Sequence, residues 1–417
     1  MWLTAGCLTA WHTAGGETDV VGKSLSLPMR STATTAPRWR WQLLMATVLF
    51  ALCSTTLSAA PNLAPRRVAL RTSCVWTTDG DAVDVKRCLG GTEGREAGVL
   101  RALDPFLVFD SYESRPNGGG SVSWHRGFPA HPHAGFDELR YITAGRLRHT
   151  DSCGNDAHTE AGGLQVLRTG TGIAHEERPD RRHLVFSGFQ VWLNAPQRRK
   201  RVEVPVHWVI PAADFANLSI ADTILGPRTG LSCHTRAGDR DDATPTSPPP
   251  RGWVKVISTA VRGSLSPLSD FFRDPPLTWL HVVIGCAGGH VLTYRTTEVG
   301  MTSPNQPRAH VVLYVMHGEL LVGDPLQGDD AADAVGRGEF AAAGDGDVVH
   351  MWPSCPAQST SVEFLLLSAP RLMEPAVVGH GFVGTTPAEV AHLNEAFVRG
   401  EFLQQCGGGG NAPRQEL

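Results

Sequence analysis

The sequence predicts an all-β fold of two antiparallel β-barrels packed face to face, followed by a short C-terminal helix. The chain has 417 residues, more than one hydrophobic core usually serves. Its 45 glycines and 29 prolines favour many tight turns over long helices. Short runs of alternating or continuous apolar residues recur between these turns, as expected of β-strands. We therefore expect two domains, each a barrel of short strands.

The N-terminal part of the chain has the composition of a targeting segment. No Asp or Glu occurs between Met29 and Thr78, and arginines precede the apolar run 43–52. Small residues at 58–60 provide a cleavage site, and the apolar run is too short for a good membrane span. The basic stretch 61–75 resembles an organellar transit segment. We expect entry into the secretory pathway or an organelle such as a plastid. The alternative is an uncleaved extension on a cytoplasmic or nuclear protein.

The rest of the chain divides into two strand-rich segments. The stretch between them contains a run of acidic residues and a Ser-Pro-Pro-Pro sequence, which is typical of a disordered linker. The predicted boundaries are a leader or disordered extension at 1–78, a first barrel at 79–227, a linker at 228–252, a second barrel at 253–403 and a flexible tail at 404–417.

The predicted helix lies near the end of the second segment. Thr386 is its expected N-cap, Pro387 its first residue and Glu389 the partner of Thr386 in a capping box. Gly400 is the expected end.

Charge and cysteine usage exclude several classes of protein. A net charge of −4 argues against direct nucleic-acid binding as the main function. The 9 cysteines are spread singly without any CxxC spacing, which excludes zinc-ribbon and thioredoxin-type sites. We expect free or buried thiols rather than a dense disulfide framework.

Two short histidine motifs predict a metal site. His131 and His133 are two residues apart, so on a β-strand both side chains project to one face; His175 and Glu177 form a second such pair. Glycine-rich turns between the pairs would let neighbouring strands bring them together. Three imidazoles and one carboxylate suit Fe(II), Mn(II), Ni(II), Cu(II) or Zn(II) and leave coordination positions open on an octahedral metal. We expect one divalent ion bound by these four residues, with Fe(II) as the leading candidate.

The neighbouring polar residues receive other assignments. A strand turns only one of two adjacent carboxylates inward, so Glu176 is expected to face solvent. His149, His158 and His183 are expected beside the ligands or on the surface, and Gln165 is interpreted as a neutral strand residue rather than one that orients a ligand. The second barrel has no HxH pair, so no metal is expected there.

Several segments, in order and at family spacing, resemble the signature segments of the pirin family. They are residues 103–110, 131–136, 151–155, 169–177, 189–196, 365–369 and 374–382. Pirins are bicupins, so the resemblance implies two jelly-roll barrels of the cupin type. It also implies a metal in the N-terminal barrel only, and a C-terminal segment packed against that barrel. Asp137 departs from the family pattern, where a Glu usually follows the Gly-Phe pair, and 111–123 has few recognisable positions. Both departures bear on the pocket mouth and therefore on substrate identity.

The resemblance also implies two functions. Pirins are similar to quercetin dioxygenases, and animal members act as nuclear, iron-dependent transcriptional co-regulators. We expect first an oxygenase that acts on a flavonol or another enol with O2, in which Glu177 accepts the enol proton. The alternative is an iron-binding, redox-sensitive regulatory protein without turnover. The expected partners are a small-molecule substrate and O2, with no direct nucleic acid and no transmembrane segment in the mature form. We expect a monomer, with a protein partner under the regulatory alternative.

Overall fold

The computed structural model describes residues 63–79, 83–90, 103–113, 127–183, 185–221, 229, 231–235, 251–259, 266–268, 271–272, 275–296, 309–357 and 359–401. The predicted signal sequence and the predicted tail at 404–417 lie outside these residues.

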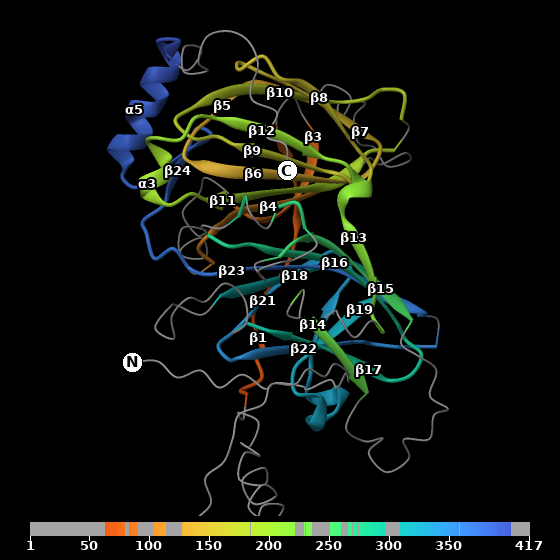
Figure 1. Cartoon of the computed structure of the whole chain (residues 1–417). Helices are drawn as coiled ribbons and strands as arrows, with labels where there is room; N and C mark the ends of the chain where they lie inside the picture. The colour runs from red at the N-terminus through yellow and green to blue at the C-terminus, as the bar shows by residue number, and fades with distance from the viewer. Residues whose placement is uncertain are drawn as a thin grey trace, which may run out of the picture. The chain divides into compact units, whose positions relative to one another are not determined.

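The described chain is all-β and forms two antiparallel barrels, which confirms the predicted fold class (Figure 1). The strands of the first barrel are β2 (Val75–Asp79), β3 (Val83–Leu89), β4 (Phe106–Glu113), β5 (Phe128–His133), β6 (Phe136–Ala144), β7 (Arg146–Asp151), β8 (Asp156–Glu160), β9 (Leu164–Arg168), β10 (Ile173–Pro179), β11 (Ser187–Asn194) and β12 (Val206–Ile210). They form a seven-stranded sheet in the order β12-β9-β6-β11-β4-β3-β2 and a four-stranded sheet in the order β5-β10-β7-β8.

The second barrel has the same plan. Its strands are β1 (Val68–Ser73), β13 (Ala216–Ser219), β14 (Leu231–Thr235), β15 (Gly252–Ser258), β16 (Thr278–Gly285), β17 (His290–Arg295), β18 (His310–His317), β19 (Glu319–Val322), β20 (Asp333–Gly336), β21 (Glu339–Ala343), β22 (Val348–Pro353) and β23 (Ser361–Ala369). A seven-stranded sheet, β1-β21-β18-β23-β16-β15-β13, covers a five-stranded sheet, β14-β17-β22-β19-β20. The remaining elements are the hairpin β24 (Val377–Gly379) and β25 (Phe382–Gly384), the helices α3 (Gln197–Lys200) and α5 (Pro387–Val398), and the 3-10 turns η2 (Ala212–Asp214), η4 (Pro325–Gln327) and η5 (Asp329–Ala331).

The two seven-stranded sheets pack against each other through a shared hydrophobic core. The ring of Phe109 on β4 lies 5.5 Å from that of Tyr314 on β18 and 5.2 Å from that of Phe340 on β21. A polar contact also joins the barrels here, because Tyr141 Oη lies 2.9 Å from His281 Nδ1. Burial of aromatic surface therefore holds the barrels face to face.

The boundary predicted at residue 78 is wrong, because the chain enters the barrels about ten residues earlier. β1 pairs with β21 of the second barrel, and β2 pairs with β3 of the first. The arginines that resemble a transit segment have structural partners instead. Arg66 is only 2% exposed and donates to the carbonyls of Gly346 and Ala309, each at 2.8 Å. A targeting segment, if present, must therefore end before β1.

This correction predicts unequal effects for two adjacent arginines. We expect Arg66→Ala to lower the free energy of unfolding by roughly 2–4 kcal/mol, because it leaves two buried carbonyls without their charged donor. Arg67→Ala is the matched control: its ion pair with Asp333 is half-exposed, and such pairs contribute little to stability. Denaturant unfolding of both variants measures the difference. Equal, small effects would restore the interpretation of this segment as a detachable leader.

The linker predicted at 228–252 is also partly wrong. β14 lies within it and pairs with β17 in the second barrel, and the linker's end is the first residue of β15. Strand β13, assigned to the first barrel from the sequence, pairs with β15 of the second. Residues 236–250, which hold the acidic run and the proline cluster, lie outside the described part of the chain. The prolines and charged residues that follow β14 made this segment look like a linker, and its partner strand is nearly 60 residues away in the sequence.

Residues 371–401, here called the C-terminal arm, leave the second barrel and pack on the first. The backbone N–H of Val383 donates to the carbonyl of Ala134 at 2.9 Å. Gly135 allows this approach, because it has φ +89° and a Cβ there would lie 2.0 Å from the Val383 carbonyl oxygen. Helix α5 begins as predicted, with the Thr386 hydroxyl accepting from the N–H of Glu389. The arm thus lies against the strand that carries the HPH motif (Figure 1).

Disulfides are present where mainly free thiols were expected. Cys74 is bonded to Cys88, and Cys286 to Cys355, while Cys233 is the free cysteine among the described residues. The sequence did not indicate these pairs, because the bonded cysteines are 14 and 69 residues apart in the chain.

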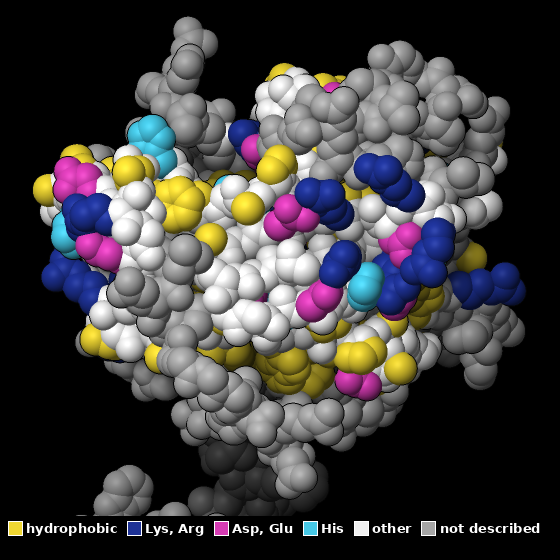
Figure 2. Space-filling model, turned by 90° about the horizontal axis from the view of Figure 1, so that it is seen from above, with side chains coloured by type: hydrophobic (Ala, Val, Ile, Leu, Met, Phe, Trp, Pro, Cys, Tyr) yellow, Lys and Arg dark blue, Asp and Glu magenta, His cyan; other side chains and the backbone are white. Residues whose placement is uncertain are grey.

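Acidic and basic side chains alternate on the face of the first barrel drawn in Figure 2. On the neighbouring strands β7 and β8, Arg148 pairs with Asp156 at 2.6 Å. None of the described helices is both long and apolar enough to span a bilayer.

Candidate metal centre

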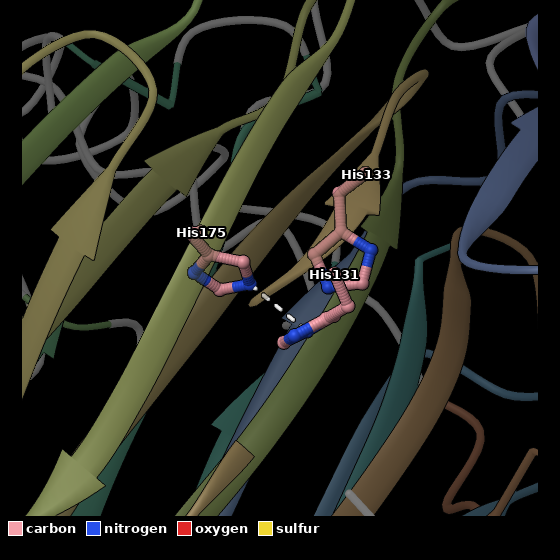
Figure 3. Close-up of side chains that lie close together, drawn as sticks. All are labelled: His131, His133 and His175. Atoms are coloured by element: carbon pink, nitrogen blue, oxygen red, sulfur yellow. Dashed lines mark hydrogen bonds between the residues drawn. The ribbon is translucent and has the colours of Figure 1, made fainter. Parts of the chain in front are cut away.

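Three histidines from two paired strands point toward one another in the first barrel (Figure 3). β5 carries His131 and His133, β10 carries His175, and antiparallel pairing sets His175 opposite His131. Residues 173, 175 and 177 of β10 are buried and alternate with more exposed neighbours, so the period of the strand turns His175 inward. Ring nitrogens of all three histidines lie within 4.8 Å of one another. The structure therefore brings together three of the four residues assigned to the metal from their spacing.

Backbone carbonyls fix the tautomers of two of these rings. His131 Nδ1 lies 2.7 Å from the carbonyl oxygen of Pro129, and His133 Nδ1 lies 3.0 Å from that of Gly381 in the C-terminal arm. A carbonyl can only accept, so each Nδ1 must carry the proton and each Nε2 must present a lone pair. Such hydrogen bonds orient metal-binding imidazoles in proteins.

The atoms that face the centre fit a cation. His133 Nε2 and Glu138 Oε2 are buried acceptors without a hydrogen-bond partner. His131 Nε2 lies 3.1 Å from His175 Nε2. Metal–nitrogen bonds of about 2.0–2.1 Å place neighbouring ligand nitrogens about 3.0–3.4 Å apart, so this spacing matches a coordination sphere. Several buried acceptors that converge without a donor are satisfied by a positive ion.

Burial keeps the three rings in the neutral form that binds metals. It lowers the pKa of His131, and it lowers the pKa values of His133 and His175 well below the ordinary value, with the neighbouring imidazoles adding to the effect. Neutral imidazole is the ligand form, so no proton has to be removed before an ion binds.

Glu177, the fourth predicted ligand, lies beside the three rings and is held by other groups. It belongs to a second cluster with His149 and His175. Its Oε1 accepts from Gln165 Nε2 at 2.5 Å, and its Oε2 lies 2.5 Å from Arg140 Nη2. Burial opposes ionisation of this carboxyl, but the Arg140 guanidinium and His149 outweigh it and lower its pKa to about 2. Gln165 therefore orients Glu177, which the sequence interpretation did not favour.

Sequence reasoning missed a second buried carboxylate, Glu138 on β6. Its Oε2 lies 3.5 Å from His175 Nε2 and 3.7 Å from His133 Nε2. Its Oε1 lies 3.0 Å from Arg140 Nη2, so one guanidinium is shared by Glu138 and Glu177. Burial raises the pKa of Glu138 to about 7. The available signal was a Glu and an Arg two residues apart in one strand, because such a pair shares one face.

His149 on β7 completes the polar surroundings of the centre. Its Nδ1 lies 3.3 Å from His175 Nδ1, and its Nε2 lies 2.9 Å from Asp151 Oδ2. Burial alone would lower the pKa of His149, but Asp151 and Glu177 offset it and raise the pKa to about 9. His158, the other candidate on this sheet, lies on the neighbouring strand β8 and is partly exposed. All clusters of three or more ligand-type side chains among the described residues lie in the first barrel.

Comparison with known proteins agrees with this architecture. The family model described as Pirin matches residues 84–193. A pirin-like protein of Solanum lycopersicum is 31% identical over 350 residues, which is 83% of this chain and 94% of that protein. A Pseudomonas aeruginosa protein, named provisionally as a quercetin 2,3-dioxygenase, is 36% identical over 246 residues, 59% of this chain and 69% of that protein.

Among solved structures, the chain is similar to a quercetin 2,3-dioxygenase from Acinetobacter baumannii. The TM-score is 0.60 at 19% identity, and the match covers 81% of this chain and 99% of the other. At this identity the likeness shows a common fold.

Proposed function

Because the chain belongs to the pirin family, we propose that it is a metal-dependent bicupin oxygenase that acts on a flavonol or another enol with O2. The observation that carries the proposal is the set of imidazole lone pairs that converge on one point. Support comes also from relatives that bear the name quercetin 2,3-dioxygenase. All clusters of this kind among the described residues lie in the first barrel.

We assign the metal to His131, His133 and His175, with Glu177 as the fourth ligand indicated by the H-x-E spacing. A divalent ion held there, Fe(II) in the first instance, would supply the Lewis acidity that activates an enol toward O2. The residues of the chain orient the ligands and accept the proton. Pro129 and Gly381 hold two rings in the ligand tautomer through their carbonyl oxygens.

The two buried carboxylates, Glu177 and Glu138, determine the charge of the site and accept the proton of the enol. Arg140 lies between Glu177 and Glu138 and balances one of their two negative charges. The cation that the site would bind balances the other, which explains why two carboxylates are stable in a buried position. We assign the acceptance of the enol proton to Glu177, with Glu138 as the competing group.

Oxygen consumption tests this proposal. Apoprotein loaded separately with Fe(II), Mn(II), Ni(II), Cu(II) or Zn(II) is mixed with a panel of flavonols and simpler enols in an oxygen electrode. We expect uptake that requires both a metal and an enol, at one O2 per substrate consumed. No enol-dependent uptake with any of these metals would overturn the oxygenase proposal. The iron-binding regulatory protein would then be the better assignment.

A further inference from the structure

The third ring of the centre, His175, differs from the other two in what holds it. His131 and His133 each donate Nδ1–H to a backbone carbonyl, which admits one tautomer. His175 Nδ1 instead faces His149 Nδ1 at 3.3 Å. An imidazole nitrogen can donate or accept, so this contact alone does not decide where the proton of His175 lies. With the proton on Nε2, His175 would donate to His131 at 3.1 Å and could not bind a metal.

Asp151 resolves this ambiguity through His149. The carboxylate oxygen Oδ2 lies 2.9 Å from His149 Nε2, and because an ionised carboxylate only accepts, it holds a proton on that nitrogen. A cation in the centre disfavours a second proton on His149, so with an ion bound the ring is neutral and has its lone pair on Nδ1. That lone pair accepts Nδ1–H of His175, which leaves His175 Nε2 free to face the centre. A second proton on His149 would point at His175 and oppose a bound cation.

Both groups are rigidly placed. Asp151 Oδ1 accepts from the backbone N–H of Cys153 at 2.9 Å and of Asn155 at 3.0 Å. His149 is fully buried, and the ring of His207 stacks on it at 3.8 Å with the planes 5° apart. The competing partner, Glu177 Oε1, is 4.0 Å from His149 Nδ1, which is beyond hydrogen-bond distance. The geometry therefore favours the contact with His175.

We infer that His149 and Asp151 are positioning residues of the metal centre, and that together they set the tautomer which turns the Nε2 lone pair of His175 toward the ion. This inference rests on the metal centre of the proposed function, though not on its oxygen chemistry. β7 presents the two side chains on one face, and its pairing with β10 places Asp151 opposite His175 and His149 opposite Glu177. The orienting partner of a metal-binding His typically affects metal affinity by 10–100-fold.

Asp151→Asn is the sharpest test, because it separates orientation from structure. The amide oxygen can still accept from the backbone N–H groups of Cys153 and Asn155, so the backbone of the turn is kept, although the hydrogen bond from Asn155 Nδ2 is lost. The amide NH2, however, can donate to His149 Nε2, which moves the His149 proton to Nδ1 and forces His175 into the wrong tautomer. We expect Co(II) affinity, measured by competition with a chromophoric chelator, to fall by about 10–100-fold. Asp156→Asn, on the exposed neighbouring strand, is the matched control and should bind Co(II) as the wild type does.

Proton NMR of the Co(II)-loaded protein provides a readout that a purely structural role would not change. The wild type should show three hyperfine-shifted, solvent-exchangeable N–H signals, one from each ligand ring. Asp151→Asn and His149→Phe should each lose or markedly shift one signal and keep the other two. Wild-type affinity together with three unshifted signals in Asp151→Asn would overturn the inference. Because the experiment reads binding, failure of the oxygenase proposal is detected separately, by oxygen uptake.

Discussion

The double variant His131→Ala, His133→Ala is expected to purify as a folded protein without metal. The substitutions remove two of the three converging lone pairs, so the metal content should fall from about one ion per chain to near zero. The barrels should persist, because their cores consist of apolar residues away from the site, including the shared core between the two seven-stranded sheets. Elemental analysis gives the metal content, and circular dichroism with thermal unfolding gives the fold.

Most of the stability that this variant loses comes from removing the His133 side chain. It is 2% exposed, and its ring lies 5.1 Å from those of Phe136 and Trp192. Truncation leaves a cavity that should lower the free energy of unfolding by about 1–3 kcal/mol. The double variant His158→Ala, His183→Ala removes two histidines from the same barrel outside the cluster and should retain full metal. If the ligand variant unfolded along with metal loss, while this control stayed folded, the fold would depend on the ion. The expectation that the barrels fold without metal would then be wrong.

The fold class and the three histidines could be predicted from the sequence because both depend on local patterns. Alternation along each strand decides which side chains share a face, and glycine positions mark the turns. The capping box at Thr386 is likewise local, and it begins helix α5 as predicted. The partners of these elements were not predictable. The proton of His133 is held by Gly381, 248 residues away, and no local pattern indicates such a contact.

The errors have a common physical cause. Arg66 and its neighbours have the composition of a targeting segment, yet Arg66 is buried against carbonyls of the second barrel. Strand β14 was assigned to a linker because of the residues that follow it. In both cases composition was used where long-range pairing decides the structure, since a basic or polar segment can be ordered if each of its polar groups finds a partner.

The two acidic residues of the centre illustrate a different limit. Period-two reasoning identified Glu177 from His175 because both lie on β10. Glu138 lies on β6, beyond the turn at Gly135 that follows His133, so the alternation of β5 does not carry over to it. The sequence alone could not show that Arg140 would be shared by the two carboxylates.

The second large effect is expected from Glu177→Gln. Three imidazoles remain, so the variant should retain much of its metal, whereas an amide cannot accept the enol proton. Turnover should therefore fall by roughly 10²–10⁴-fold, the range typical of general acid–base groups. Steady-state oxygen uptake and elemental analysis on the same preparation separate loss of turnover from loss of metal. Glu176→Gln, the adjacent residue that pairs with Arg178 on the outer face, is the matched control and should remain close to wild type.

Glu138→Gln decides whether the proton-accepting role belongs to Glu177. The amide oxygen can still accept from Gln190 and Arg140, which contact Glu138 Oε1 at 2.8 and 3.0 Å, so the local structure should survive. If Glu177 is the base, Glu138→Gln should reduce turnover less than Glu177→Gln does. The reverse order would assign proton acceptance to Glu138, whose pKa burial raises to about 7.

The same Glu177 variant distinguishes an enzyme from a regulator. Removing a buried negative charge close to the ion stabilises Fe(II) relative to Fe(III), so the Fe(III)/Fe(II) midpoint potential should rise in either case. In an oxygenase this rise accompanies the loss of turnover. In a regulator it accompanies a change in partner affinity, in a protein whose wild type consumes no oxygen with any enol. Spectroelectrochemical titration of the wild type and Glu177→Gln, set beside their oxygen uptake, therefore separates the two functions, and an unchanged midpoint would show that Glu177 exerts no electrostatic effect on the centre.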